Sequence, residues 1–323
     1  MIPPQIMVPK WRTGSSVTSR PAVAARDHSD PNHRPINVVT FLAAHPTEAF
    51  TLAEIARHLG LSKGSAHRVM TALTQTGFVS RHPRHKTYSL GVVLVAIGQA
   101  ALERHRGIES ARREMVGLAA ELNVSCGASA IVSNEYLLLA REGVPRTYDG
   151  LTLVGERRFI VPPIGVGYMA WRSQPEIEAY LDSGASYLSE TSRRHLLAAF
   201  PEIRRRGYAM AANGAAVRKL MQAMVVPVGR WPDQIPALPS LQSQAEIPVE
   251  QFQLLTLDEA RGNGVNYVSA PVFSPDGDIT FEILMSGLPI NLNEAEFDRY
   301  TARLKLAADT VTKEIRGRKP EAW

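Results

Sequence analysis

Polar and basic side chains gather on one side of a helix that the residues between positions 62 and 73 predict. The apolar residues of this stretch have the i, i+3, i+4, i+7 spacing of a half-buried helix: Ala66, Val69, Met70 and Leu73. Behind a cap at Ser62, the outward face would carry Lys63, Ser65, His67, Arg68 and Thr71. Arginine can pair bidentately with guanine, and free backbone N–H groups at a helix start can hold a phosphate. The face is therefore suited to binding double-stranded DNA, although the pattern also fits a surface helix whose charges are solvated.

A second cationic element follows this helix and favours the DNA interpretation. Two short apolar segments, Phe78-Val79 and Tyr88–Leu90, flank a basic stretch and predict a β-hairpin. The basic residues of the hairpin are Arg81, Arg84 and Lys86. The hairpin occupies the position of a wing, which would straddle DNA phosphates. It is therefore a second cationic element, independent of the helix.

The preceding residues complete a winged helix-turn-helix. Apolar residues at helical spacing before Pro46 predict a first helix: Ile36, Val39 and Leu42. Thr51 and Glu54 form a capping box that opens a second helix, which ends at Gly60. Within the third helix, Gly64 is unfavourable by about 1 kcal/mol relative to alanine. This glycine either lets the backbone approach DNA closely or is only a point of low helix stability.

The charge of the chain is divided unevenly along its length. The 323 residues carry a net charge of +5, but residues 1–107 hold thirteen Lys or Arg and only five Asp or Glu, a net +8. The remaining residues hold 23 Lys or Arg and 26 Asp or Glu, a net −3. This asymmetry predicts that one domain faces a polyanion and that the other does not.

The stretch from Leu52 to Gly91 resembles the N-terminal domain of the IclR family of transcriptional regulators. Its segment LSKGSAHR (61–68) is similar to the family's recognition helix except at Gly64, and YSLG (88–91) matches the end of the wing. Further along, IRRRGYA (203–209) and NYVSAPVFSPDGDITFEILMSG (266–287) also resemble family segments. The resemblance implies a DNA-binding regulator that acts as a homodimer or a dimer of dimers, with repression and activation left open.

The residues after 107 predict a mixed α and β domain with an antiparallel sheet. The predicted helices are 92–107, 108–123, Gly165–Trp171, Pro175–Leu181, Thr191–Arg206 and 297–315. The predicted strands are Cys126–Val132, Tyr136–Arg141, Leu151–Val154, Tyr208–Ala212, Asn266–Phe273 and Ile279–Met285. Residues 1–33 have the composition of a disordered extension, and about 213–250 that of an inserted loop.

By the resemblance, this second domain is a GAF-like module that binds a small-molecule effector. In better-known members a carboxylate lies against backbone N–H groups at a helix start, which here is Ile164, Gly165 and Val166. The positions of the family's polar set are Leu257, Tyr267, Leu284 and Ser286, of which Ser286 alone keeps the family residue. Because an apolar lining disfavours an unpaired carboxylate, we expect an effector larger and more apolar than a two- or three-carbon acid, or a pocket filled by side chains.

Other functional classes have little support in the sequence. A single cysteine, Cys126, excludes an internal disulfide and a Cys-rich zinc site, and no catalytic motif or metal-ligand cluster occurs, so we expect no cofactor. The longest apolar run, Leu90–Leu102, is too short for a bilayer, which predicts a cytoplasmic protein without a membrane partner. Gly165–Ala170 matches a dinucleotide fingerprint, but Pro162-Pro163 breaks the strand that should precede it. His195 is expected at the surface.

Together these patterns predict an α+β protein: an N-terminal winged helix-turn-helix joined by a linker helix to a GAF-like α/β effector domain. The expected boundaries are 34–91 for the DNA-binding domain, 92–107 for the linker and 108–318 for the effector domain. The linker helix and its flanks present the expected dimer surface: Val92, Val93, Val95 and Ile97. The alternative is an enzyme, a hydrolase or reductase that uses the second-domain pocket and carries a basic N-terminal appendage.

Overall fold

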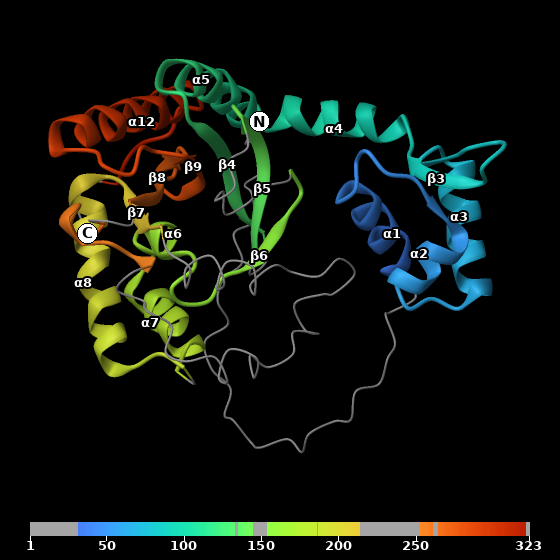
Figure 1. The fold of residues 1–323 in the computed structure, drawn as a ribbon, viewed down its shortest axis with the longest axis horizontal. Helices are drawn as coiled ribbons and strands as arrows, with labels where there is room; N and C mark the ends of the chain where they lie inside the picture. Colours follow the sequence, from blue (N-terminus) through green and yellow to red (C-terminus); the bar gives the residue numbers. More distant parts are fainter. Residues whose placement is uncertain are drawn as a thin grey trace. The chain divides into compact units, whose positions relative to one another are not determined.

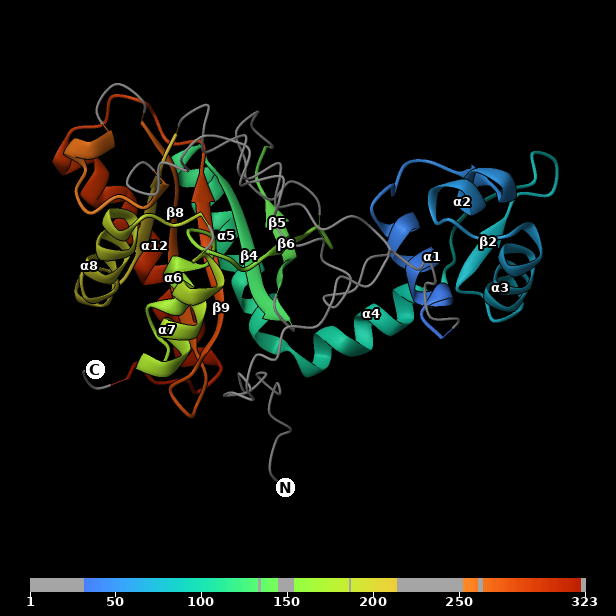
Figure 2. The same cartoon turned by 90° about the horizontal axis from the view of Figure 1, so that it is seen from below.

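The computed structural model describes residues 32–132, 135–144, 154–185, 187–213, 252–260 and 264–320. These residues form two compact units, one of residues 32–104 and one of the described residues from 105 onward. Figure 1 and Figure 2 show the elements of each unit. The expected α+β architecture with an N-terminal helix-turn-helix is confirmed.

The N-terminal unit consists of three short helices and a small antiparallel sheet. The helices are α1 (Arg34–Ala43), α2 (Leu52–His58) and α3 (Lys63–Gln75). The sheet has the order β1-β3-β2, with β1 at Phe50–Thr51, β2 at Val79–Arg81 and β3 at Thr87–Leu90. A further helix, α4 (Val93–Arg104), contains no buried residue. The core lies between the three helices and the hairpin: Val38, Phe41, Leu42, Ile55, Met70, Leu73, Val79 and Tyr88.

Local side-chain bonds fix where α2 and α3 begin. The Thr51 hydroxyl accepts the Glu54 N–H at 3.3 Å, and the Thr51 N–H donates to the Glu54 carboxylate at 2.8 Å. The Ser62 hydroxyl accepts the Ser65 N–H at 3.2 Å. Both caps predicted from the sequence are thereby confirmed, and each satisfies N–H groups that lack a partner within the helix.

Two glycines allow the chain to close the hairpin. Gly77 follows α3 with a φ of +75°, a left-handed conformation that side chains rarely adopt. Gly91 follows β3, donates its N–H to the Phe78 carbonyl at 2.8 Å, and lies so close to Gly77 that a Cβ at position 91 would overlap the Gly77 carbonyl oxygen. The ends of the wing are therefore held together by backbone contact.

The second unit is built on a six-stranded antiparallel sheet with the order β6-β5-β4-β9-β8-β7. The strands are β4 (Ser125–Val132), β5 (Glu135–Glu142), β6 (Arg157–Phe159), β7 (Ala209–Ala212), β8 (Val265–Phe273) and β9 (Ile279–Ser286). Helices α5 (Arg106–Leu122) and α12 (Glu294–Glu314) pack side by side on one face of the sheet (Figure 2). The opposite face meets α6 (Val166–Met169), which packs against α7 (Gln174–Ser183) and α8 (Glu190–Arg206).

The alternation of side chains along β9 assigns the two faces of the sheet. Phe281 lies against Gly107 of α5, whereas the neighbouring Glu282 lies against Gly167 of α6. Because successive side chains of a strand point to opposite faces, Ile283 and Met285 belong to the α5 and α12 side. Leu284 and Ser286 belong to the α6 side.

Several expected elements differ from those observed. Strands β1 and β6 were not expected; each is very short and lacks the alternating run that marks a strand in sequence. The helix expected at Gly165–Trp171 is a single turn. The strand expected at Leu151–Val154 lies, except for its last residue, outside the described residues, as do most of the extension at 1–33 and of the loop at 213–250.

Candidate DNA-binding surface and effector cavity

The exposed face of α3 holds most of the predicted DNA-binding side chains. Lys63, His67, Arg68 and Thr71 are exposed, as is the cap Ser62. The apolar residues Ala66, Met70 and Leu73 are buried on the opposite side of the helix. The helix therefore separates a packed face from a polar one, as its spacing predicts.

Ser65 is an exception to this arrangement. The sequence predicts it on the outward face, but it is only 8% exposed. Its hydroxyl accepts hydrogen bonds from the Arg34 guanidinium at 3.2 Å and from the Ser62 hydroxyl at 3.0 Å. Position 65 lies one helical turn before Val69, so the buried stripe is wider than its apolar residues alone indicate. Ser65 joins the start of α3 to α1.

The wing between β2 and β3 presents Arg81, Arg84 and Lys86, all exposed. Its turn is held by His82, a residue that the sequence reasoning missed. The His82 Nδ1 accepts the backbone N–H groups of Arg84 at 3.2 Å and of His85 at 3.1 Å. A polar ring at the start of a tight turn is the signal that could have identified it, because short side chains with an acceptor often hold turns in this way.

A groove between α3 and the wing gathers part of the predicted set. His67 and Thr71 of α3 line it together with Arg81 and Lys86 of the wing. Lys63, Arg68 and Arg84 do not line the groove and lie exposed outside it. Helix and wing thus supply cations and hydrogen-bonding groups to one shared concave surface.

The second unit contains a cavity of about 70 Å³ on the α6 side of the sheet. Five of the predicted effector residues line it: Ile164, Gly165, Tyr267, Leu284 and Ser286. Val166 and Leu257 do not line it; Val166 is buried in α6 and Leu257 is half-buried just before a short 3-10 turn (Asp258–Ala260). Since a single water needs about 10–15 Å³ of such space, the cavity has room for a small molecule.

The charged residues of this cavity were not predicted from the sequence. Glu282, Arg141 and Arg158 all line it, from three different strands. The signal for Glu282 is visible in the sequence, since it is the only charged residue in the apolar strand Ile279–Ser286. What the sequence lacks is the pairing that brings Ser129 of β4 opposite Glu282.

Glu282 is buried, with 2% of its surface exposed. The Tyr136 hydroxyl donates to its Oε2 at 2.5 Å, and the Ser269 hydroxyl donates to its Oε1 at 3.1 Å. Burial raises the pKa of Glu282 to about 7, although both hydrogen bonds act in the opposite direction. Within the described ranges no Lys or Arg forms an ion pair with this carboxyl group. The cavity therefore contains a carboxyl group that titrates near neutral pH.

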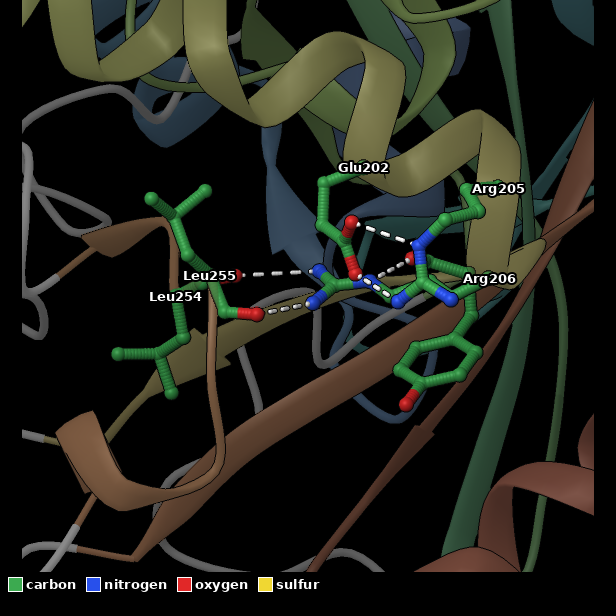
Figure 3. Close-up of polar contacts among 6 residues, drawn as sticks. Glu202, Arg205, Arg206, Leu254 and Leu255 are labelled. Carbon is green, nitrogen blue, oxygen red and sulfur yellow. Dashed lines mark hydrogen bonds and ion pairs between the residues drawn. The ribbon is translucent and has the colours of Figure 1, made fainter.

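One wall of the cavity is held by α8. Phe252 lines the cavity and meets the ring of Tyr267 edge-on. The segment after Phe252 accepts hydrogen bonds from Arg206, whose guanidinium reaches the carbonyl groups of Leu254 and Leu255 at 3.1 and 3.0 Å (Figure 3). The neighbouring residues Glu202 and Arg205 of α8 form an ion pair at 2.5 Å (Figure 3).

His195 also belongs to this wall and is not the surface residue that the sequence predicts. It is half-buried, and its Nε2 lies 2.7 Å from the Gln253 carbonyl oxygen. The charged residues around it in the sequence suggested exposure, but its position on α8 turns it toward the segment 252–255. His195 and Arg206 together anchor Phe252 in place.

The dinucleotide fingerprint does not occur in a nucleotide-binding context. The described strand pairs of the second unit are all antiparallel, so among these residues Gly165–Ala170 has no βαβ context, and Gly165 is a helix N-cap with a φ of +99°. In the part of the chain that the structure describes, no group of His, Cys, Asp or Glu could hold a metal ion. Among the described helices none is long and apolar enough to cross a membrane.

Comparison with known proteins agrees with this geometry. The model of the IclR helix-turn-helix domain matches residues 34–83. The transcriptional regulator XynR of Escherichia coli is 26% identical over 225 residues, which cover 65% of this chain and 84% of XynR. The crystal structure of an IclR transcriptional regulator from Alicyclobacillus acidocaldarius has a TM-score of 0.61 at 18% identity and covers 88% of this chain and 98% of its own.

A further solved structure is that of an IclR homolog from Microbacterium hydrocarbonoxydans complexed with 4-hydroxybenzoate. It has a TM-score of 0.59 at 17% identity and covers 89% of this chain and 99% of its own. At such identities the two structures establish the fold of the chain, and that fold extends over both units.

The Gly64→Ala substitution tests why a glycine lies in α3. A Cβ at this position would meet nothing within 4 Å, so the alanine variant should be more stable by up to about 1 kcal/mol, because alanine favours the helix. Urea unfolding measures the stability, and fluorescence anisotropy measures the affinity for duplex DNA. A stabilised variant with weakened DNA binding indicates close backbone approach, whereas unchanged binding indicates a weak spot. A variant that is less stable would contradict the open environment of Gly64.

The pKa of Glu282 predicts how stability depends on pH. The folded state binds the proton more tightly than the unfolded state, so its contribution to stability is complete below about pH 4.5 and is lost as the pH rises through about 7. Three tyrosines interact with Glu282, and burial raises their pKa values, so they stay neutral in this range: Tyr136, Tyr168 and Tyr267.

Between pH 5 and 8 the wild type should lose about 2–3 kcal/mol relative to Glu282→Gln, which cannot titrate. Urea unfolding of both proteins at several pH values measures this difference. Parallel pH profiles for the two proteins would show that Glu282 does not titrate in this range.

Proposed function

We propose that the chain is a transcriptional regulator of the IclR family in which α3 reads an operator while the wing holds the DNA backbone. The observation that carries the proposal is the groove in which His67 and Thr71 of α3 face Arg81 and Lys86 of the wing. A recognition helix contacts base edges with its N-terminal half, where Lys63, His67 and Arg68 lie exposed. Ser62 and the cations Arg84 and Lys86 then contact phosphates, which position the protein but carry no sequence information.

The same proposal assigns one function to each of three segments of the chain. Residues 34–91 bind DNA, 92–107 connect, and 108–318 sense an effector. The division is supported by the two compact units, which are separated along the sequence between Arg104 and His105, where α4 ends and α5 follows. The excess of positive charge in residues 1–107 supports it as well, because phosphate contacts dominate affinity for DNA.

We further propose that the effector is more apolar than a two- or three-carbon acid. Tyr267, Leu284 and Phe252 give the cavity three apolar or aromatic surfaces. The single turn of α6 offers little of the dipole that favours an anion at the start of a longer helix. A related structure contains 4-hydroxybenzoate, a ligand of this larger kind. The cavity of about 70 Å³ argues against the alternative in which side chains fill the pocket.

A homodimer, alone or paired into a dimer of dimers, is the proposed assembly. A single recognition helix covers only a few base pairs, so two copies on two half-sites are physically expected. Helix α4 and its flank expose apolar side chains at Val92, Val95 and Ile97, which are 78%, 70% and 46% exposed. Apolar residues at this exposure along one helix favour a surface covered by a second copy.

Arginine substitutions test the DNA-binding assignment. Arg68→Ala should weaken binding to the operator by about 1–3 kcal/mol and relax sequence preference, because a base contact is lost. Arg84→Ala should weaken binding to all sequences alike and reduce the salt slope by about 1, because a phosphate contact is lost. Footprinting of the chain's own upstream region supplies the operator, and anisotropy at several salt concentrations supplies the affinities.

Arg194→Ala removes an exposed arginine of α8 and is the matched control. This control should bind the operator as the wild type does. If Arg68→Ala and Arg84→Ala also bound like the wild type, the assignment of α3 and the wing would be wrong.

A charge on α4 tests the proposed dimer. Val95→Asp should yield monomers in sedimentation velocity, because an unpaired carboxylate is costly to bury in an apolar interface. The monomer should remain folded, since α4 contains no buried residue. Val116→Asp changes an equally apolar exposed residue of α5 and should leave the assembly intact. A dimer that survives Val95→Asp would exclude α4 as the interface.

A further inference from the structure

The polar groups of the effector cavity fall into two sets at different positions along the strands. Ser129 of β4 pairs with Glu282 of β9, whereas Ser125 pairs with Ser286, four residues away on each of these antiparallel strands. At about 3.3 Å per residue, the two pairs lie roughly 13 Å apart. Between them, Gly127 pairs with Leu284 of β9 and, on its other side, with Arg141 of β5. The cavity thus has a Glu282 end and a Ser286 end.

The Glu282 end contains a hydroxyl group that no protein atom satisfies. The Ser129 side chain is 0% exposed and lines the cavity, and among the described residues its Oγ has no hydrogen-bond partner. A buried hydroxyl without a partner costs free energy, so native structures usually pair such groups with protein, water or ligand. Ser129 lies opposite Glu282, whose own carboxyl accepts from Tyr136 and Ser269. A carboxylate can accept about four hydrogen bonds, which leaves capacity for a ligand donor.

The Ser286 end has a cationic side chain instead of an acid. Arg141 lines the cavity and donates from its Nη2 to the Ser125 hydroxyl at 3.2 Å, and Ser286 lines the cavity beside it. A guanidinium with neighbouring hydroxyl groups is a donor set that suits a carboxylate. Arg158, the other arginine of the lining, lies opposite Tyr136 and forms an ion pair with Glu156 at 2.6 Å. Arg141 is therefore the cation of the lining that lies toward the Ser286 end.

We propose that Glu282 and Ser129 bind a hydroxyl group of the effector while Arg141 binds its carboxylate, so that the effector is a hydroxylated organic acid. The inference rests on the proposed effector role of the cavity and adds the chemistry that the cavity selects. A hydroxyl group can donate to Glu282 and accept from Ser129 at the same time. A carboxylate at this end would face a second acid, so one of the two groups would have to take up a proton or two like charges would be buried together.

The test compares acids that differ only in one terminal hydroxyl group. Isothermal titration calorimetry with the full chain measures three pairs: benzoate and 4-hydroxybenzoate, 3-phenylpropionate and 3-(4-hydroxyphenyl)propionate, hexanoate and 6-hydroxyhexanoate. In at least one pair the hydroxylated acid should bind about tenfold tighter or more, because the acid without it leaves Ser129 and Glu282 unpaired. With 6-aminohexanoate as a third member of its series, the hydroxyl form should still bind best.

Variants connect this preference to the Glu282 end. Glu282→Met removes the carboxyl group at similar length and should abolish the preference, Glu282→Gln keeps an acceptor and should retain part of it, and Ser129→Ala should reduce it without adding bulk. Glu135→Gln is the matched control, because Glu135 is a buried acid of β5 that does not line the cavity. It should keep the preference of the wild type. Because the readout is a ratio of two affinities, a general loss of stability does not imitate it.

Four results would overturn the inference: equal affinity within every pair, a preference that survives both Glu282→Met and Ser129→Ala, tighter binding of 6-aminohexanoate, or no binding by any of these acids. DNA binding measured on the same preparations distinguishes a failure of this inference from a failure of the proposed function. Intact binding to the operator with any of those results refutes only the hydroxylated acid. Absence of operator binding by the wild type refutes the proposed function itself.

Discussion

The period of two along β9 is the constraint on which the second unit depends. Phe281, Ile283 and Met285 supply the core beneath α5 and α12, and the residues between them supply the cavity. A shift of one residue would place Glu282 in that core and Phe281 in the cavity, so core and site share one register. The apolar side fixes this register, because burying Glu282 against α5 would leave a charge without any partner. The chemistry of the cavity is therefore secured by packing on the far side of the sheet.

The N-terminal unit meets a different constraint, since a small domain buries little surface and depends on local order. The caps at Thr51 and Ser62, the contact of Gly77 with Gly91, and the turn held by His82 are all short-range devices. None of these devices uses the exposed side chains of Lys63, His67, Arg68 or Thr71 on α3. The exposed face of α3 and the wing can therefore bind a polyanion, which agrees with the excess of Lys and Arg in residues 1–107.

Features that depend on contacts between residues close in sequence could be predicted, whereas features that depend on distant residues could not. Capping residues, helical spacing and the glycine after α3 act within a few positions, so α2, α3 and the wing were predicted nearly as they occur. The cavity joins residues that are more than 100 positions apart, such as Tyr136 with Glu282, and nothing local reveals which strands will pair. The family resemblance located Tyr267, Leu284 and Ser286, yet it was silent on Glu282 and Arg141, which give the cavity its charges. Ser65 was misplaced because a serine can occupy the edge of a buried stripe when its hydroxyl has partners.

The form of α6 explains why the charges in the cavity matter. A long helix aims aligned peptide dipoles at an anion, but the single turn Val166–Met169 has few to align. In the proposed binding mode the attraction for a carboxylate comes from a side chain, and Arg141 lines the cavity and can supply it. An acid held by one guanidinium rather than by a helix start is fixed at one end only. The group at the other end of the ligand contacts the opposite side of the cavity. Selectivity among acids therefore depends less on the carboxylate than on that second group.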